Sequence, residues 1–316
     1  APRRALFSGY REDTRKCRLQ SIRWLHNVTS MTKFPRMERT PFQSRIGLDH
    51  PVVQGPFGGG LSTVELTALV SSRGGLGSFG AHLLEGDAII ALTQSVRALT
   101  DKPFAINLWV SDHDPGGLSL SEEAFARAWS AFEALYHHYG LAKPDMPERY
   151  HPSFAAQVEA LLEARPPVFS FVFGIPSPAV LRECRRRDIA TIGAATTLAE
   201  GLALEAAGVD AIVASGFEAG GHRPSFLQAA EDSLTGTMAL TRAIASRVRR
   251  PVIAAGGIAD APGVRAALAL GAHGAQIGTA FLACRESGTV DAHREILFGT
   301  RAEHTLLTRA YTGRLA

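Results

Sequence analysis

Short apolar runs that end at small residues alternate with longer stretches of helical periodicity along most of this chain. Each apolar run indicates a buried strand, because it is too short for a helix and a loop-forming residue follows it. The pattern predicts strands at 50–54, 75–79, 104–110, 168–173, 190–192, 210–214, 251–255 and 274–277. It predicts helices at 64–72, 86–99, 121–139, 153–164, 177–187, 198–207, 237–248, 261–270 and 279–284.

The regular alternation of strands and helices predicts the fold class. Strands joined by helices form a parallel sheet with helical crossovers. Eight such units in roughly 250 residues are typical of an α/β protein with a (β/α)8 TIM barrel, here with helical insertions. We assign residues 37–316 to this single domain. A doubly wound open sheet is the competing interpretation, which periodicity does not exclude.

Composition narrows the classes of function. The formal net charge of +3 is too small to indicate a nucleic-acid partner. No apolar run reaches the roughly 18 residues that a membrane helix needs. The three cysteines, Cys17, Cys184 and Cys284, are far apart and lack metal-ligand spacing, so we expect neither a metal site nor a disulfide framework. The expected location is the cytoplasm.

The first 36 residues differ from the rest of the chain in composition. They are rich in Arg and Lys, and only Glu12 and Asp13 are acidic. Such a composition is typical of an organellar transit peptide. The alternative, which we prefer, is a disordered or non-native extension upstream of the true start, since Met31 and Met37 both precede the organised part. This extension is left out of the fold prediction.

Chemistry in such barrels sits at the C-terminal ends of the strands. The loop after the strand at 210–214 contains Gly220 and Gly221, whose backbone can approach a ligand closely, followed by His222. An imidazole there is a candidate proton acceptor, because its pKa lies near neutrality. The alternative is a solvated loop with a capping histidine. His82 and His113 also follow predicted strands and are secondary candidates.

The last two strand ends suggest a phosphate site. Gly256 and Gly257 follow the seventh strand, and Gly278 and Thr279 follow the eighth. In barrels these loops and the start of a short helix commonly bind phosphate through backbone N–H groups and the helix dipole. The alternative is that the glycines only close tight turns. Asn107, a polar residue inside an apolar strand, requires a partner if it is buried.

Several motifs together resemble one enzyme family. EAGGHR at 218–223, AAGGI at 254–258, QIGTAFLACRES at 276–287 and HPVVQGPFGGGLS at 50–62 are similar to segments of the nitronate monooxygenases. These enzymes, formerly called 2-nitropropane dioxygenases, are FMN-dependent (β/α)8 barrels. The similarity extends to residues 191–214 and to TRAYTGR at 308–314, and covers nearly everything from about residue 41 onward.

The resemblance implies roles for individual residues. His222 matches the catalytic histidine that takes the α-proton of a nitroalkane. Ser215 stands where many members carry a glutamine near the flavin, and the chain stops at Ala316, where members continue into a further helical segment, so we expect a truncated C-terminal segment. The positions implied to bind FMN are Gly55, Pro56, Phe57, Gly58, Asn107, Ser215, Gly220, Gly221, Gly256, Gly257, Gln276, Gly278 and Thr279.

The implied reaction is the FMN-dependent oxidation of an alkyl nitronate or nitroalkane by O2 to a carbonyl compound and nitrite, without a metal. One alternative is an FMN-dependent NAD(P)H oxidoreductase on the same scaffold, either an enoyl reductase or a quinone reductase. A second is a barrel of the inosine-monophosphate dehydrogenase type, which needs a cysteine in an active-site loop. A third is a flavin-binding protein without turnover. The oligomeric state is not predicted.

Overall fold

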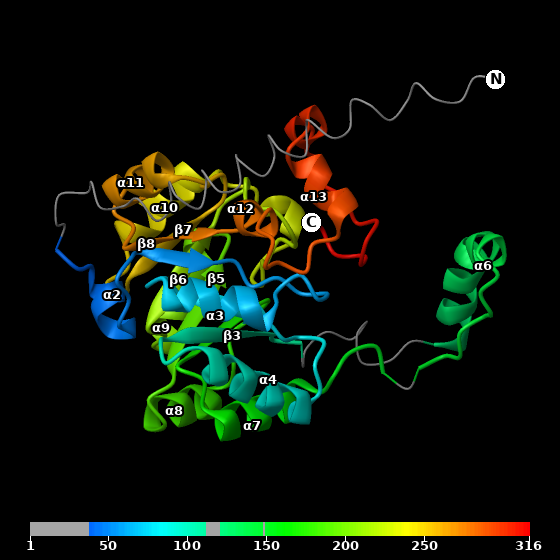
Figure 1. Cartoon of the computed structure of the whole chain (residues 1–316), viewed down its shortest axis with the longest axis horizontal. Coiled ribbons are helices and arrows are strands. Elements are labelled where there is room, and N and C mark those ends of the chain that lie inside the picture. The colour runs from blue at the N-terminus through cyan, green and yellow to red at the C-terminus, as the bar shows by residue number, and fades with distance from the viewer. Residues whose placement is uncertain (1–37, 112–120, 148) are drawn as a thin grey trace.

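Eight parallel strands form the centre of the molecule (Figure 1). The computed structural model describes residues 38–111, 121–147 and 149–316, so the N-terminal extension 1–36 and His113 lie outside the described residues. The sheet order is β1-β8-β7-β6-β5-β4-β3-β2. The strands are β1 (Val52–Gln54), β2 (Gly77–Gly80), β3 (Phe104–Trp109), β4 (Val168–Val172), β5 (Ala190–Ala195), β6 (Ala211–Ser215), β7 (Val252–Ala255) and β8 (Gly274–Ile277).

The two strands at the ends of this order, β1 and β2, also meet each other. A parallel bridge joins Val53 to Leu76. The amide of Gln54 donates to the Leu76 carbonyl at 2.9 Å, and the amide of Leu76 donates to the Val52 carbonyl at 2.9 Å. The sheet therefore closes on itself. This closure confirms the (β/α)8 barrel and excludes the doubly wound open sheet.

Helices surround the strands, and most begin at a residue whose side chain caps them. Thr63, Ser153, Ser177 and Thr197 each accept a hydrogen bond from a first-turn amide of the helix that follows. No helix in the described ranges is long and apolar enough to cross a membrane. The helices around the barrel are α3 (Val64–Ser72), α4 (Gly86–Leu99), α7 (Phe154–Ala164), α8 (Pro178–Arg186), α9 (Leu198–Ala207), α10 (Thr237–Ala245) and α11 (Ala261–Ala269).

The fifth strand is longer than predicted, because Gly193 does not end it. The pattern predicts a strand that ends at Ile192. In the structure β5 continues to Ala195. A Cβ on Gly193 would lie 2.3 Å from Cδ2 of Leu204 and 2.9 Å from Cε2 of Phe171. Gly193 is therefore a packing residue that lets α9 approach the sheet.

The N-terminal end of the barrel is closed by a helix that the periodicity did not predict, α2 (Pro41–Ile46). Phe42 on this helix is buried, and Thr40 donates through Oγ1 to the His273 carbonyl at 2.9 Å. Three further short elements were also not predicted: α13 (Asp291–Leu297) and the 3-10 turns η2 (Ala230–Asp232) and η3 (Thr300–Glu303). The predicted helix at 279–284 is shorter and forms α12 (Thr279–Leu282).

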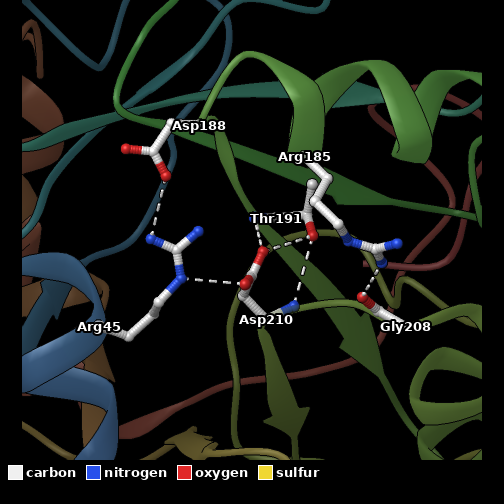
Figure 2. A network of polar contacts seen from close by, with 6 residues as sticks. All are labelled: Arg45, Arg185, Asp188, Thr191, Gly208 and Asp210. Carbon is white, nitrogen blue, oxygen red and sulfur yellow. Dashed lines mark hydrogen bonds and ion pairs between the residues drawn. The ribbon is translucent and has the colours of Figure 1, made fainter.

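A polar network holds α2 to the same end of the sheet (Figure 2). Asp210 accepts from the Thr191 amide at 2.8 Å, from the Thr191 hydroxyl at 3.0 Å and from Nε of Arg45 at 3.1 Å. Arg45 also lies 3.6 Å from Asp188. The strand predicted from residue 210 begins one residue later, at Ala211. Residues at this face of a barrel contribute to stability rather than chemistry.

The predicted helical insertion is present as α6 (Glu122–His138), with Ser121 as its N-cap. None of its residues is buried, and the helix stands apart from the barrel (Figure 1). The C-terminal mouth of the barrel lies between the loops that follow the strands, and the candidate site is there.

Candidate active site

The glycine-rich loops after β1, β6 and β8 meet at the C-terminal mouth. A Cβ built on Gly55 would lie 3.3 Å from Cα of Gly278 and 3.1 Å from Cε1 of Phe57. A Cβ on Gly220 would have Oγ1 of Thr279 as its nearest neighbour, at 4.0 Å. Predicted cofactor-binding residues from opposite ends of the sequence therefore lie side by side.

Gly256 and Gly257 join this group through the loop after β6. Their φ angles are +123° and +66°, which residues with a Cβ rarely adopt. A Cβ on Gly256 would lie 2.7 Å from the Ala219 amide nitrogen. Glu218 fixes the same loop, because its carboxylate accepts from the amide of Thr237 at 2.7 Å and from its hydroxyl at 2.8 Å. Glycine at position 256 is thus required by a close backbone contact.

Open space lies beside several of these glycines. A Cβ on Gly221 would have no heavy atom within 4 Å, and a Cβ on Gly278 would meet only Cε1 of Phe57 at 4.0 Å. The backbone here is approachable by a ligand, which is the property that a phosphate-binding loop needs. Gly220 and Gly221 directly precede His222 in the chain, and the role of these glycines in binding a phosphate stays a prediction.

His222 is half-buried on a wall of aromatic side chains at this mouth. Its ring meets Trp109 edge to face, with centroids 5.1 Å apart and planes at 70°. It also faces Phe173, with centroids 6.3 Å apart. Nε2 lies 2.7 Å from Oγ1 of Thr312. Burial lowers the pKa of His222 below its ordinary value, and the guanidinium of Arg314 lowers it further, so the imidazole is neutral at pH 7.

The wall continues to His82, which stacks on Trp109. We use the name aromatic wall for His82, Trp109, Phe173 and His222. Burial, the neighbouring His222 and Arg314 together lower the pKa of His82 to about 4. A Cβ on Gly58 would lie 2.1 Å from Cε1 of His82, so this glycine lets the loop after β1 pack against the wall. His82, a secondary candidate from the sequence, thus lies on the same aromatic wall as His222, and its contact with a substrate stays a prediction.

A buried arginine holds the loop that carries His222. Arg223 is 2% exposed. It donates to the Gly216 carbonyl at 2.5 Å, the Ser215 carbonyl at 3.1 Å and the Ser233 carbonyl at 2.7 Å. Three charge-assisted hydrogen bonds to backbone oxygens fix the path of the chain between β6 and His222. Ser215 itself is buried at the end of β6.

A buried carboxylate anchors the far side of the same loop. Glu200 is fully buried at the start of α9. It accepts from the amide and hydroxyl of Thr196 at 2.6 and 2.7 Å, and from the amides of Phe226 and Leu227 at 2.6 and 3.1 Å. Donors from both segments satisfy the carboxylate, so the loop after His222 is tied to the loop after β5.

Asn107 has the partner that its burial requires. Its Nδ2 donates to Oγ of Ser170 on β4 at 3.0 Å. Gln276 lies half-buried on β8, in register with Val53 and Ala255. Pro56 is half-buried in the loop after β1. The roles of these residues in binding a cofactor stay predictions.

Four residues of the site were not predicted as such: Trp109, Phe173, Thr312 and Arg314. Trp109 and Phe173 stand at the ends of predicted apolar strands, where an aromatic residue can equally belong to the core. Phe173 has a φ of +67°, a strained value for a residue with a Cβ. Thr312 and Arg314 belong to the TRAYTGR segment, and nothing local connects that segment to His222.

The two described cysteines are buried away from solvent. Burial raises the pKa of Cys184 to about 11 and that of Cys284 to about 12. Thiols with such pKa values are poor nucleophiles at neutral pH. The barrel of the inosine-monophosphate dehydrogenase type, which needs a reactive cysteine in a loop, has no support here. Among the residues described, no group of three or more His, Cys, Asp or Glu side chains is placed to hold a metal ion.

The closed parallel barrel, with a neutral histidine and glycine-rich loops at its C-terminal mouth, defines a (β/α)8-barrel enzyme. A family model described as nitronate monooxygenase matches residues 39–316. The chain therefore belongs to the nitronate monooxygenase family of oxidoreductases. It is 44% identical over 274 residues to a nitronate monooxygenase of Paraburkholderia phytofirmans, covering 86% of this chain and 74% of that protein.

Two solved structures share the fold of this chain. The nitroalkane oxidase from Streptomyces ansochromogenes superposes with a TM-score of 0.77 at 34% identity, covering 88% of this chain and 78% of that one. FabK from Thermotoga maritima superposes with a TM-score of 0.67 at 28% identity, covering 89% and 74%. Both similarities extend over most of the barrel.

Proposed function

We propose that this protein is an FMN-dependent enzyme that oxidises alkyl nitronates, and nitroalkanes after deprotonation, with O2 to a carbonyl compound and nitrite. The observation that carries the proposal is the half-buried, neutral His222 on the aromatic wall, beside the glycine loops after β1, β6 and β8. Membership of the nitronate monooxygenase family and similarity to a nitroalkane oxidase support it.

The glycine loops fit a flavin phosphate by their open backbone. Gly220, Gly221 and Gly278 leave room for a ligand at the N–H groups, and Gly256 and Gly257 shape the adjoining turn. When bound, the flavin supplies the electron transfer. The protein binds the flavin, orients the substrate against it and sets the electrostatics of the site. The full set proposed to hold FMN is Gly55, Pro56, Phe57, Gly58, Asn107, Ser215, Gly220, Gly221, Gly256, Gly257, Gln276, Gly278 and Thr279.

His222 acts as the base for a neutral nitroalkane. Its lowered pKa keeps the ring unprotonated at neutral pH, so one ring nitrogen accepts the α-proton. Trp109 and Phe173 orient the ring through edge contacts, and Thr312 bonds to Nε2. A substrate that arrives as the nitronate anion needs no base. With that substrate, His222 acts through its position in the site and not as a base.

The deciding experiment begins with the absorption spectrum of the purified protein, which we expect to show bound flavin. Under anaerobic conditions, stopped-flow mixing with a nitronate should reduce the flavin faster than mixing with NADH. In air, the nitronate should yield nitrite. A flavin that nitronate does not reduce would contradict the proposal.

The structural similarity to FabK favours one second candidate, an FMN-dependent NAD(P)H oxidoreductase such as an enoyl reductase. It would share the flavin site but take electrons from NAD(P)H. Fast reduction by NADH with no reaction with nitronate would select it. A flavin-binding protein without turnover would be yellow, yet would consume no oxygen with either compound.

A further inference from the structure

A hollow bordered by arginines lies at the N-terminal end of the barrel, away from the mouth that carries His222. Its volume is about 470 Å3, and it is lined by Glu205, Arg247, Arg249 and Arg250. Glu205 belongs to the last turn of α9, and the three arginines lie between the end of α10 and the start of β7. Loops that lead from a helix into a strand lie at the N-terminal end of such a barrel. We call these four residues the arginine hollow.

The carboxylate of the arginine hollow is bound to the main chain. Oε1 of Glu205 accepts a hydrogen bond from the backbone amide of Arg249 at 2.5 Å. This contact fastens the loop before β7 to the end of α9. Within the described part of the chain, Glu205 makes no ion pair with any of the three guanidinium groups.

The arginine side chains of the hollow are exposed. Among the residues that the structure describes, none contributes a hydrogen bond or an ion pair to these three guanidinium groups. Other arginines at this end of the barrel are satisfied by the protein. Arg45 pairs with Asp210 at 3.1 Å, and Arg185 donates to the Gly208 carbonyl at 3.3 Å (Figure 2). The guanidinium donors of the arginine hollow are therefore available to a ligand.

The charge of the hollow calls for an anion. Three positive charges against one negative charge leave a formal charge of +2 on its lining. A cation just beyond a helix is favoured by the helix dipole, which accounts for Arg247 two residues after α10. It does not account for Arg249 and Arg250, because the effect falls off within one turn. Like charges around one hollow repel one another, and an anion between them would remove that repulsion.

We propose that the arginine hollow binds a compact polyphosphate, either free pyrophosphate or the phosphate chain of a nucleotide. A guanidinium presents a planar fork of N–H donors that matches two oxygens of a phosphate. A lining charge of +2 favours an anion with two or more charges over a single carboxylate. The volume of about 470 Å3 lies within the range of roughly 300–1,000 Å3 that is typical of small-molecule sites.

The test measures the binding of pyrophosphate and of ATP to the purified full chain by isothermal titration calorimetry. Arg249→Gln and Arg250→Gln should each weaken pyrophosphate binding about tenfold or more, because charge-assisted hydrogen bonds are the strong ones. Arg250→Lys should keep part of the affinity, since it retains the charge but loses the fork. The control is Arg127→Gln, which changes an exposed arginine of α6 and should bind pyrophosphate as wild type does.

The ATP measurement distinguishes the two sources of the polyphosphate. Binding of ATP at least as tight as that of pyrophosphate, and equally sensitive to Arg249→Gln, would identify the phosphate chain of a nucleotide. Binding of pyrophosphate alone would identify the free anion.

A second readout locates the bound anion. In NMR spectra of the 15N-labelled protein, pyrophosphate should shift the amide signals of Arg249 and Arg250 and leave those of Gly221 and Gly278 unchanged. Flavin content and nitronate oxidation should be equal in all variants, because the hollow and the proposed flavin site lie at opposite ends of the barrel. Pyrophosphate affinity that is unchanged in both glutamine variants, or no binding of either compound at millimolar concentration, would overturn the inference.

Discussion

His82 lies flat against Trp109, with ring centroids 3.8 Å apart and planes within 2° of parallel. Nδ1 of His82 is buried without a hydrogen-bond partner in the described structure. A protonated ring there would place a charge in a poorly solvated position near Arg314, which explains why the pKa of His82 falls to about 4. This relationship couples the stability of the fold to pH.

The first prediction concerns acid stability. The folded pKa of about 4 lies below the unfolded value of 6.5, so the unfolded state binds the proton first as pH falls. The stability present above pH 6.5 is lost between pH 6.5 and 4, by about 3 kcal/mol. His82→Phe keeps the stack and removes the titration. Urea unfolding across this pH range should show a flatter dependence in His82→Phe.

The control for this variant is His304→Gln, which alters an exposed histidine. It should leave the pH dependence of the free energy of unfolding unchanged. The same slope in His82→Phe as in wild type would show that other groups account for the loss.

The second prediction concerns the proposed base. His222→Asn removes the proton acceptor and keeps a polar side chain of similar reach toward Thr312. The turnover rate of this variant with neutral nitroalkanes should fall by about 100-fold or more, which is the usual contribution of a general base. Flavin content and nitronate oxidation should stay close to wild type. Steady-state nitrite release with both substrates measures this, and unchanged nitroalkane rates would remove His222 from proton transfer.

In the wild-type enzyme the same base sets a pH dependence. Because the pKa of His222 is below its ordinary value of 6.5, nitroalkane turnover should persist at pH 6.5 and decline only at lower pH. A decline that already begins well above pH 6.5 would contradict the lowered pKa.

The third prediction tests the proposed phosphate loop. Gly257→Val introduces a side chain at a φ of +66° beside Glu218 of the loop after β6 and should reduce the flavin content of the purified protein. Backbone strain alone would also destabilise the fold. Gly140→Val is the matched control, because Gly140 has a φ of +65° and lies beyond α6, outside the barrel. It should keep its flavin. Normal flavin content in Gly257→Val would place the phosphate elsewhere, and equal flavin loss in both variants would assign the loss to backbone strain.

The fourth prediction concerns the buried Glu200. Glu200→Gln turns one of two acceptor oxygens into a donor that faces two existing donors. The free energy of unfolding should fall by about 2–4 kcal/mol, the usual effect of breaking a buried charged network. Chemical denaturation measures it. Glu159→Gln, at an exposed position of α7, should stay near wild type, and a similarly small change in Glu200→Gln would contradict the anchoring role.

Local sequence predicted the barrel well, because strands and helices leave their own periods in the chain. The eight strands and the polar position Asn107 were evident from residues within one element. The strand ends also indicated His222 and the glycine loops, and the resemblance to a known family then implied their roles. The end of β5 was missed because a glycine that closes a turn and one that packs against a helix look the same in sequence.

What the sequence by itself determined is therefore the order of elements and the candidate chemistry at strand ends. Only the tertiary structure decided that the sheet closes between Val53 and Leu76, and that Thr312 and Arg314 reach a histidine some 90 residues earlier. The physical reason is the separation in sequence between the residues that interact. Periodicity and caps depend on neighbours within a few residues, whereas closure of the barrel and assembly of the aromatic wall depend on packing between segments that the sequence keeps far apart.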